Sequence, residues 1–454
     1  MGKPTTSSKT PLLFQSKLLC FSLFYLCIAL FLALHKSFSP KQCIVKSLHF
    51  HPVQTALFSY PPSYGEHKYA LSTQRSSCSS PVFFSDYRSV FNNIQDLCGN
   101  SSAFSPVLKY VQGKDDSFGG NFRTQKRISY FDHMNHSLEV PCGFFKKFPI
   151  SNSDRIAMET CNGLVVVSAI FNNHDKIRQP RGLESKTLET LCFFMFIDDV
   201  TFKGLEDCQL ISSAKSDSEE YKIGAWRIVK VSSKNLYENP AMNGVIPKHL
   251  VHRLFPNSKF SIWIDAKLQL TVDPLLLIHA LVVSKNVDMA ISKHPFFIHT
   301  VEEAMATARW KKWRDVDALQ KQMETYCENG LQPWTPKKLP YPSDVPDSAL
   351  ILRKHGLISN LFSCLLFNEL EAFNPRDQLA FAFVRDKMSP KLRLYMFEEE
   401  VFEKICVEYR HNIKGVGKMS KFEGKRAKED LFIKNSSHCQ KYLLKMWGRG
   451  ESRN

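Results

Sequence analysis

A series of short apolar runs in the middle of the chain constrains the fold most. Each run is nearly continuous in hydrophobicity, which is typical of strands that helices cover on both faces. Segments with helical character lie between the runs, so strand and helix alternate. The sequence therefore predicts an α/β fold with a largely parallel sheet and flanking helices. The expected strands are 163–171, 192–197, 225–231, 260–264, 288–292 and 349–353, and the expected helices are 246–254, 274–283, 301–319, 357–370 and 376–387.

Carboxylates follow two of these strands directly. Asp198 and Asp199 follow the second strand, and Asp265 follows the fourth. Ligands of open α/β sheets bind outside the carboxyl ends of the strands, so we expect these acids to bind substrate or phosphate. The alternative role for Asp265 is to cap the next turn.

The segment Asp265-Ala-Lys267 has the position of a known metal-binding motif. In GT-A nucleotide-sugar transferases, an Asp-x-Asp pair at a strand end holds a divalent ion against the diphosphate. This chain has one carboxylate there. The cofactor is therefore open: we expect Asp265 to be the ligand of any Mn or Mg ion, and Lys267 to pair with phosphate directly.

Four later residues complete the candidate site. Lys293 and His294 come at the end of the strand 288–292, where His294 is a candidate catalytic, metal-binding or phosphate-binding group. Asp377 and Gln378 begin a helix, where a late acid of GT-A enzymes contacts the acceptor or serves as a base. The alternatives are an ordinary loop histidine and an acid that complements the helix dipole.

The motifs of other hydrolase classes are absent from the sequence. It contains no HExxH zinc motif, no GxSxG nucleophile motif and no P-loop. His249 and His252 share one helical face, but the neighbouring Lys248 and Arg253 favour an exposed basic face over a metal site.

The N-terminal region contains an apolar run, Leu18–Leu34, with Lys3, Lys9 and Lys17 before it. Its length suits one short membrane span, and the lysines favour a cytosolic N-terminus. A cleaved signal peptide is the alternative, although no A-x-A site follows. We expect a single-pass type II membrane protein of the Golgi or the ER, with a cytosolic tail (1–17), an anchor (18–34), a lumenal stem (35–155), a catalytic domain (156–413) and a basic tail (414–454).

Cysteine content and charge agree with a lumenal body. Eleven cysteines lie beyond the apolar run and would form disulfides in an oxidising lumen, with one left over. The net charge of +16 suits anionic lipid or acidic polysaccharide, and beside a membrane we expect no nucleic-acid partner. Sequons at Asn100, Asn135 and Asn435 are candidate glycosylation sites.

Many separate blocks, in one order, resemble the plant glycosyltransferase-like family that includes the turgor-regulation alkaline ceramidase and a hexosyltransferase of seed mucilage. The N-terminal segments Tyr64-Gly-Glu-His-Lys-Tyr and Ser76-Ser-Cys-Ser-Ser-Pro resemble the ceramidase most. The blocks of the main body are Ser168-Ala-Ile-Phe, Gln179-Pro-Arg, Cys192-Phe-Phe-Met-Phe-Ile-Asp-Asp, Trp263-Ile-Asp-Ala-Lys, Ile291-Ser-Lys-His-Pro, Ser343-Asp-Val-Pro, Asn360-Leu-Phe-Ser-Cys and Pro375-Arg-Asp-Gln-Leu.

This resemblance implies a GT-A-like fold, in a plant Golgi type II membrane protein that hydrolyses ceramide to a sphingoid base and a free fatty acid. The usual alkaline ceramidases resemble seven-span proteins with a histidine-bound zinc, which this sequence does not. A Golgi hexosyltransferase with a nucleotide sugar and a glycan acceptor is therefore the alternative, and a non-catalytic scaffold is a third. Convergence of Asp198, Asp199, Asp265 and His294 in one pocket would favour the two enzymes.

Overall fold

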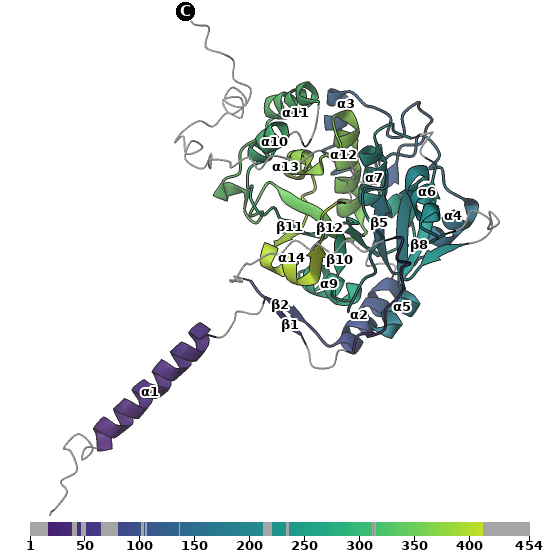
Figure 1. The fold of residues 1–454 in the computed structure, drawn as a ribbon. Helices are drawn as coiled ribbons and strands as arrows, with labels where there is room; N and C mark the ends of the chain where they lie inside the picture. The colour runs from purple at the N-terminus through teal and green to yellow at the C-terminus, as the bar shows by residue number, and fades with distance from the viewer. Residues whose placement is uncertain are drawn as a thin grey trace, which may run out of the picture.

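A central eight-stranded sheet with helices on both faces forms the body of the protein (Figure 1). This computed structural model describes residues 17–38, 43–46, 51–64, 80–100, 104, 107–135, 137–211, 220–232, 236–310, 312 and 315–411. The strand order is β13-β11-β12-β9-β5-β6-β8-β7. The strands are β5 (Leu164–Ile170), β6 (Cys192–Asp198), β7 (Tyr221–Ile223), β8 (Trp226–Val231), β9 (Phe260–Ile264), β11 (Met289–Lys293), β12 (Pro346–Lys354) and β13 (Leu394–Phe397).

The sheet is mostly parallel, as predicted. β5, β6, β8 and β9 pair in parallel, and so do β11 and β13. β12 runs antiparallel to both β9 and β11, and the edge strand β7 is antiparallel to β8. The reversal of β12 matters for the site, because it brings the start of this strand to the edge at which β9 and β11 end.

Helices cover the sheet in two layers, each with its own apolar cluster. Side chains of β5 alternate between them: Val165 and Val167 face α7, α12 and α13, whereas Val166 and Ile170 face α2, α9 and α14. The helices are α2 (Tyr87–Gly99), α3 (Thr124–Ile128), α4 (Asn152–Glu159), α5 (Ser185–Thr190), α6 (Asp199–Asp207), α7 (Pro240–His249), α8 (Val251–Leu254), α9 (Pro274–Ile278), α10 (Thr300–Arg309), α11 (Val316–Glu328), α12 (Leu357–Ala372), α13 (Asp377–Lys387) and α14 (Glu399–Ile405).

Two helices have other bounds than the sequence predicts. The helix expected over 246–254 starts earlier, at Pro240, because Asn239 accepts a hydrogen bond from the Ala241 amide as N-cap, and it breaks at Leu250. The helix expected over 301–319 is two helices. Asp315 caps the second of them by accepting from the Ala318 amide at 2.9 Å.

Part of the expected stem packs into the body. Phe118, Phe131 and Phe148 are buried in the cluster on the α12 side of the sheet. The Cys142–Cys364 disulfide ties this segment to α12, and Cys161–Cys192 links the regions that enter β5 and β6. Three small two-stranded pairings lie outside the main sheet: β1 (Ile44–Lys46) with β2 (Val82–Phe84), β3 (Lys109–Tyr110) with β4 (Glu139–Val140), and β10 (Leu268–Leu270) with β14 (Cys406–Glu408).

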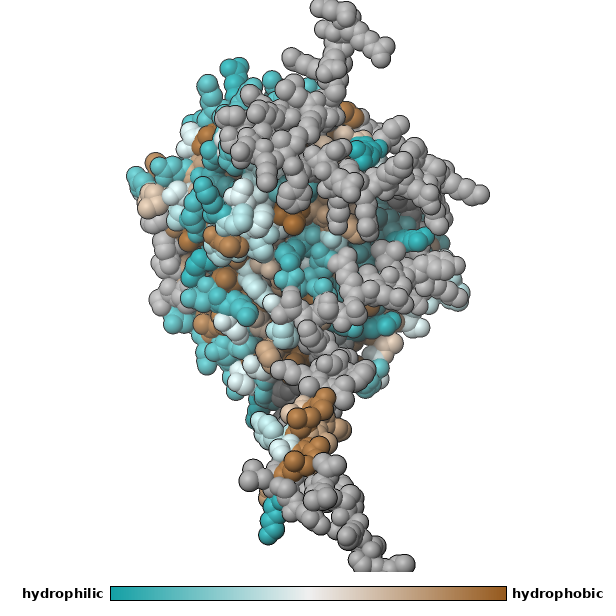
Figure 2. Space-filling model, turned by 90° about the vertical axis from the view of Figure 1, so that its left-hand side faces the viewer, coloured by the Kyte–Doolittle hydropathy of each residue, from teal (hydrophilic) through white to brown (hydrophobic). Residues whose placement is uncertain are grey.

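The expected anchor forms a helix, α1 (Lys17–Phe38), that projects from the body (Figures 1 and 2). Its side chains Phe21 and Tyr25 are 75% and 76% exposed. In the described ranges, no helix meets the length and hydropathy that crossing a membrane requires. The membrane span over 18–34 therefore stays a prediction, and the basic tail 414–454 lies outside the described residues.

Candidate functional site

A polar pocket of about 1090 Å³ lies at the edge of the sheet where β9 and β11 end and β12 begins. Five of the predicted site residues line it: Asp265, Lys267, His294, Asp377 and Gln378. They come from two strand ends and from the start of α13. The side chains that the sequence did not single out and that also line it include Lys248, Lys312, Asp347, Ser348, Arg376, Glu408 and His411.

Lys248 of α7 lies at the centre of the ion pairs in this pocket. Its Nζ is 2.8 Å from Asp377 Oδ2, 3.7 Å from Asp265 Oδ1 and 3.2 Å from Ser348 Oγ. Burial alone would lower the pKa of Lys248, but the carboxylates of Asp265 and Asp377 outweigh burial and raise it. Lys248 is therefore a fixed cation. We had expected it on an exposed basic face, which is wrong: its side chain is 13% exposed.

Asp377 is almost fully buried and accepts hydrogen bonds on both oxygens. Ser348 Oγ donates to Oδ1 at 2.7 Å, and His249 Nε2 lies 3.2 Å from Oδ2. Burial opposes ionisation, but the charge of Lys248 and the hydrogen bond from His249 hold the pKa of Asp377 well below its usual range. Such a carboxylate is a weak base. The geometry therefore favours a positioning role over the predicted role as a base.

Asp265 is the more accessible acid, with a side chain 31% exposed. Trp263 Nε1 donates to its Oδ1 at 2.7 Å, on the same oxygen that approaches Lys248. Its Oδ2 has no hydrogen-bond partner among the described residues. Asp265 can therefore accept a hydrogen bond from a substrate with this oxygen.

The residues around Asp265 fit a resident divalent ion poorly. Mn or Mg takes several oxygen ligands. Among the described residues, Asp265 belongs to no group of three close His, Cys, Asp or Glu ligands, and its neighbours Lys248 and Lys267 are cationic. Burial would lower the pKa of Lys267, but Glu408, Asp347 and Asp265 raise it, so this charge is firmly held.

Asp347 is the acid that the sequence analysis missed. It begins β12 opposite Ser292 of β11, and its Oδ1 accepts from the Ala349 amide at 3.1 Å. Burial raises the pKa of Asp347; Lys267 opposes this rise, whereas Glu408 and Asp265 add to it. A raised pKa makes this carboxylate a stronger base than an ordinary aspartate. Recognising β12 as an antiparallel strand would have identified Asp347 at the site.

His294 is held as a hydrogen-bond donor. Its Nδ1 accepts from the amides of Phe296 and Phe297, both at 3.1 Å, and its ring stacks on that of Phe297. Burial lowers the pKa of His294 to about 4, so the ring is neutral, and we assign its proton to Nε2. Nε2 lies 3.9 Å from the buried Oε2 of Glu303. In this tautomer the unprotonated nitrogen, Nδ1, is engaged by two backbone amides and is not available to act as a base.

Of the remaining predicted binding residues, Gln378 lies in the pocket and Lys293 lies outside its lining. Gln378 lines the pocket and donates to the Pro346 carbonyl at 3.2 Å. Lys293 is not in the pocket lining and pairs with Glu398.

Asp198 and Asp199 lie outside the pocket lining, so the expected convergence of four residues holds for Asp265 and His294 only. Asp198 is 4% exposed and caps α6, accepting from the Thr201 amide at 2.8 Å and from the Asn172 amide at 2.7 Å. Asp199 pairs with Lys230 at 3.4 Å. The geometry therefore gives Asp198 a capping role instead of the predicted substrate contact.

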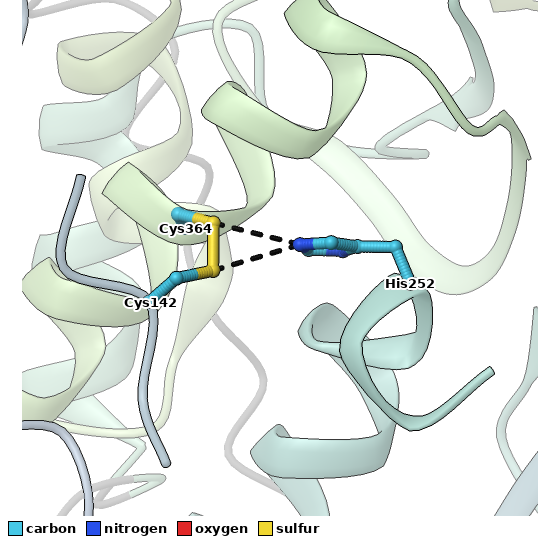
Figure 3. Close-up of side chains that lie close together, drawn as sticks. All are labelled: Cys142, His252 and Cys364. Carbon is cyan, nitrogen blue, oxygen red and sulfur yellow. Dashed lines mark hydrogen bonds between the residues drawn. A yellow bond between two sulfur atoms is a disulfide. The ribbon is translucent and has the colours of Figure 1, made fainter. Parts of the chain in front are cut away.

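His249 and His252 are both buried, so the expected exposed basic face is wrong for them too. His252 Nε2 lies 3.5 Å from each sulfur of the Cys142–Cys364 disulfide (Figure 3). These three residues are a group close enough to hold a metal ion. The disulfide bond, however, occupies both sulfurs.

A larger groove of about 1860 Å³ adjoins the pocket. Phe296 lines both cavities and is 72% exposed. None of the predicted site residues lines the groove, which has aromatic and aliphatic walls from Trp334, Leu339 and Tyr341. We place the chemistry in the smaller pocket, because the ionisable groups converge there.

Two of the predicted glycosylation sites are accessible. Asn100 ends α2 and is exposed, and Asn135 is an exposed loop residue whose Oδ1 accepts from the Ser137 amide. Asn435 lies outside the described residues. Modification at these positions stays a prediction.

Comparisons with known proteins give the family. A family model described as "TOD1/MUCI70, glycosyltransferase-like domain" matches residues 107–411. The chain is 61% identical to "Alkaline ceramidase TOD1" of Arabidopsis thaliana, over 99% of this chain and 100% of that protein. It is 37% identical to "Probable hexosyltransferase MUCI70" of the same plant, over 65% of this chain and 53% of that protein.

Solved structures resemble the chain only weakly. The apo structure of the WbbM bifunctional glycosyltransferase is 11% identical with a TM-score of 0.25, covering 52% of this chain and 38% of that one. The apo structure of mouse xyloside xylosyltransferase 1 is 8% identical with a TM-score of 0.24, covering 53% of this chain and 79% of that one. The full-length and domain matches in sequence are much stronger, and they show that this chain belongs to the TOD1/MUCI70 family of enzymes with a glycosyltransferase-like domain.

Proposed function

We propose that the polar pocket hydrolyses the amide bond of ceramide and releases a sphingoid base and a free fatty acid. The observation that carries this proposal is the 61% identity, over 99% of the chain, to a relative named as an alkaline ceramidase. The pocket supplies groups that fit the chemistry, and the adjoining groove supplies apolar walls that fit the chains of a lipid.

Amide hydrolysis requires a base for water, a donor or cation for the oxyanion and a proton for the leaving amine. Asp347 is the base in this proposal, because burial makes it more basic than an ordinary aspartate. Lys267 lies in the same pocket and supplies positive charge to the oxyanion. Protonated Asp347 then returns the proton that it took from water to the leaving amine, and His294 Nε2–H donates a hydrogen bond toward the substrate.

The lipid would lie across the boundary between the two cavities. Phe296 is exposed and lines both of them. A lipid can therefore place its apolar chain in the groove and its polar part in the pocket. Trp334 and Leu339 then face the chain, and Asp265 Oδ2 accepts from a hydroxyl of the sphingoid base.

Glycosyl transfer from a nucleotide sugar is the second candidate, and two observations favour it. The family model describes a glycosyltransferase-like domain. In addition, Lys267, Lys312 and Arg376 line the pocket and are suited to pairing with a diphosphate. Asp265 then binds a hydroxyl of the sugar or of the glycan acceptor.

We further propose a Golgi type II arrangement with a lumenal body. The apolar side chains of α1 are exposed on a helix that projects from the body, as an anchor requires. The Cys142–Cys364 and Cys161–Cys192 disulfides suit an oxidising compartment, and Asn100 and Asn135 are exposed. Glycosidase treatment should increase the electrophoretic mobility of the membrane-derived protein. Protease protection of the N-terminus instead of the body, in sealed vesicles, would contradict this topology.

The reaction is tested by incubating the purified protein with labelled ceramide and, separately, with a panel of labelled nucleotide sugars. We expect fatty-acid release without any nucleotide, at least a hundredfold slower for Asp347→Asn and also impaired for Asp265→Asn. Asp199→Asn is the matched control, because this acid lies outside the pocket lining and is exposed. Sugar transfer without ceramide turnover would favour the second candidate.

A further inference from the structure

We propose that the ammonium group of Lys248 occupies the place that a divalent metal ion would take between Asp265 and Asp377, so that this pocket works without a metal. The proposal rests on the proposed function only in placing the active site in this pocket. It holds for either reaction, because both would use the same carboxylates.

The geometry of Lys248 resembles that of a bound cation. Its Nζ faces three oxygens from three separate elements: Asp377 Oδ2 at 2.8 Å, Ser348 Oγ at 3.2 Å and Asp265 Oδ1 at 3.7 Å. An ammonium group has three N–H donors, which matches three acceptors. Two of these oxygens lie within hydrogen-bond distance of the ammonium group, and Asp265 at 3.7 Å adds an ion-pair contact. Lys248 is therefore held by protein oxygens and acts as a positioning residue instead of a substrate contact.

Further hydrogen bonds hold the Asp377 carboxylate in place beside Lys248. Arg353 Nη2 is 3.4 Å from His249 Nδ1, so this nitrogen accepts and the other ring nitrogen donates to Asp377. Burial lowers the pKa of His249 to about 4, so the ring is neutral as this pattern requires. Ser348 donates its hydroxyl proton to Asp377, which leaves the Ser348 oxygen free to accept from Lys248. Each hydrogen bond of the network therefore joins one donor to one acceptor.

The charge balance of the network leaves little need for a second cation. Asp265 and Asp377 carry two negative charges, and Lys248 and Arg353 carry two positive ones at neutral pH. Arg353 is 2% exposed, and Lys248 and Asp377 are largely buried. A divalent ion between Asp265 and Asp377 would add two positive charges beside the ammonium group of Lys248, and their repulsion is unfavourable where Lys248 and Asp377 are largely buried. It would also have to displace Lys248 from Asp265 and Asp377.

The test uses Mn²⁺ alone, titrated calorimetrically into the full-length protein without substrate. We expect no saturable binding to the wild-type protein at millimolar Mn²⁺. In Lys248→Met, which keeps an unbranched side chain one atom shorter and removes the charge, we expect one Mn²⁺ site, and adding Asp265→Asn should abolish it. Lys230→Met is the matched control: it uncovers Asp199 outside the pocket and should bind no Mn²⁺.

The wild-type titration decides the proposal even if Lys248→Met does not fold. Saturable Mn²⁺ binding to the wild type that is lost in Asp265→Asn would overturn the proposal, and so would a tenfold or larger loss of turnover in a chelator that added Mn²⁺ reverses. Unchanged turnover in the chelator supports it. Because the titration contains no substrate, its outcome does not depend on which reaction the pocket catalyses.

Discussion

Replacing Asp377 by asparagine removes the carboxylate that holds Lys248, with almost no change in volume. The pair is largely buried, with side-chain exposures of 8% and 13%, so solvent screening offsets little of the loss. Removing one partner of a buried ion pair costs roughly 3 to 5 kcal/mol, because the other charge stays buried without its partner. Asp265 still lies 3.7 Å from Lys248 and retains part of the attraction. We therefore expect Asp377→Asn to lower the free energy of unfolding by about 3 kcal/mol at pH 7.

The pH dependence of this loss follows from the depressed pKa of Asp377. A carboxyl group whose folded pKa lies below its unfolded value stabilises the protein above the unfolded pKa, which is about 3.9 for aspartate. That contribution is lost as the pH falls further, toward the folded pKa. The difference in stability between wild type and Asp377→Asn should thus be equal at pH 7 and pH 5, and smaller at pH 3.

Urea denaturation followed by circular dichroism measures both effects, with the disulfides kept intact. Asp199→Asn is the control, because its partner Lys230 is 44% exposed, and surface pairs of this kind contribute about 0 to 1 kcal/mol. The reasoning is refuted if Asp377→Asn costs no more than Asp199→Asn, or if its cost grows as the pH falls below 4.

Three further predictions concern other parts of the molecule. Asp198→Ala should cost about 1 kcal/mol in urea denaturation because it removes the N-cap of α6, and turnover should stay at the wild-type level; a large fall in turnover would return Asp198 to the active site. Cys142→Ala with Cys364→Ala should lower the free energy of unfolding by about 2 to 5 kcal/mol, because the bridge closes a loop over 222 positions of sequence separation; unchanged stability would show that the bridge is not formed. Phe296→Ala should raise KM for long-chain ceramide more than for a short-chain analogue; equal effects on both would remove the groove from the substrate path.

The strands of the core could be predicted from the sequence because burial on both faces makes each of them a continuous apolar run. β9 is entirely buried, so its sequence is a continuous apolar run, and its prediction as 260–264 agrees with the structure. The start of α7 at Pro240 and the start of a separate helix α11 were missed, because local caps at Asn239 and Asp315 decide them. Hydrophobic periodicity carries no signal for such caps.

The site could be predicted only in part, for two physical reasons. An acid at the end of a strand can either cap the next helix or bind a ligand. Asp198 caps α6, whereas Asp265 faces the pocket. In addition, the rule that ligands bind at the carboxyl ends of strands does not cover an antiparallel strand. Since β12 runs in reverse, Asp347 and Ser348 reach the same edge from the start of a strand. Lys248 was missed because a lysine on a helix is usually solvated, and only tertiary packing buries it between two acids.

Cleavage of ceramide in this pocket is tested most directly by fatty-acid release from labelled ceramide, measured with the purified protein from neutral to alkaline pH. We expect release that needs no nucleotide and that falls at least a hundredfold in Asp347→Asn but not in Asp199→Asn. The claim would be contradicted by an absence of ceramide turnover across this pH range, combined with saturable binding of a nucleoside diphosphate that requires Lys267. That result would make glycosyl transfer the reaction of this pocket.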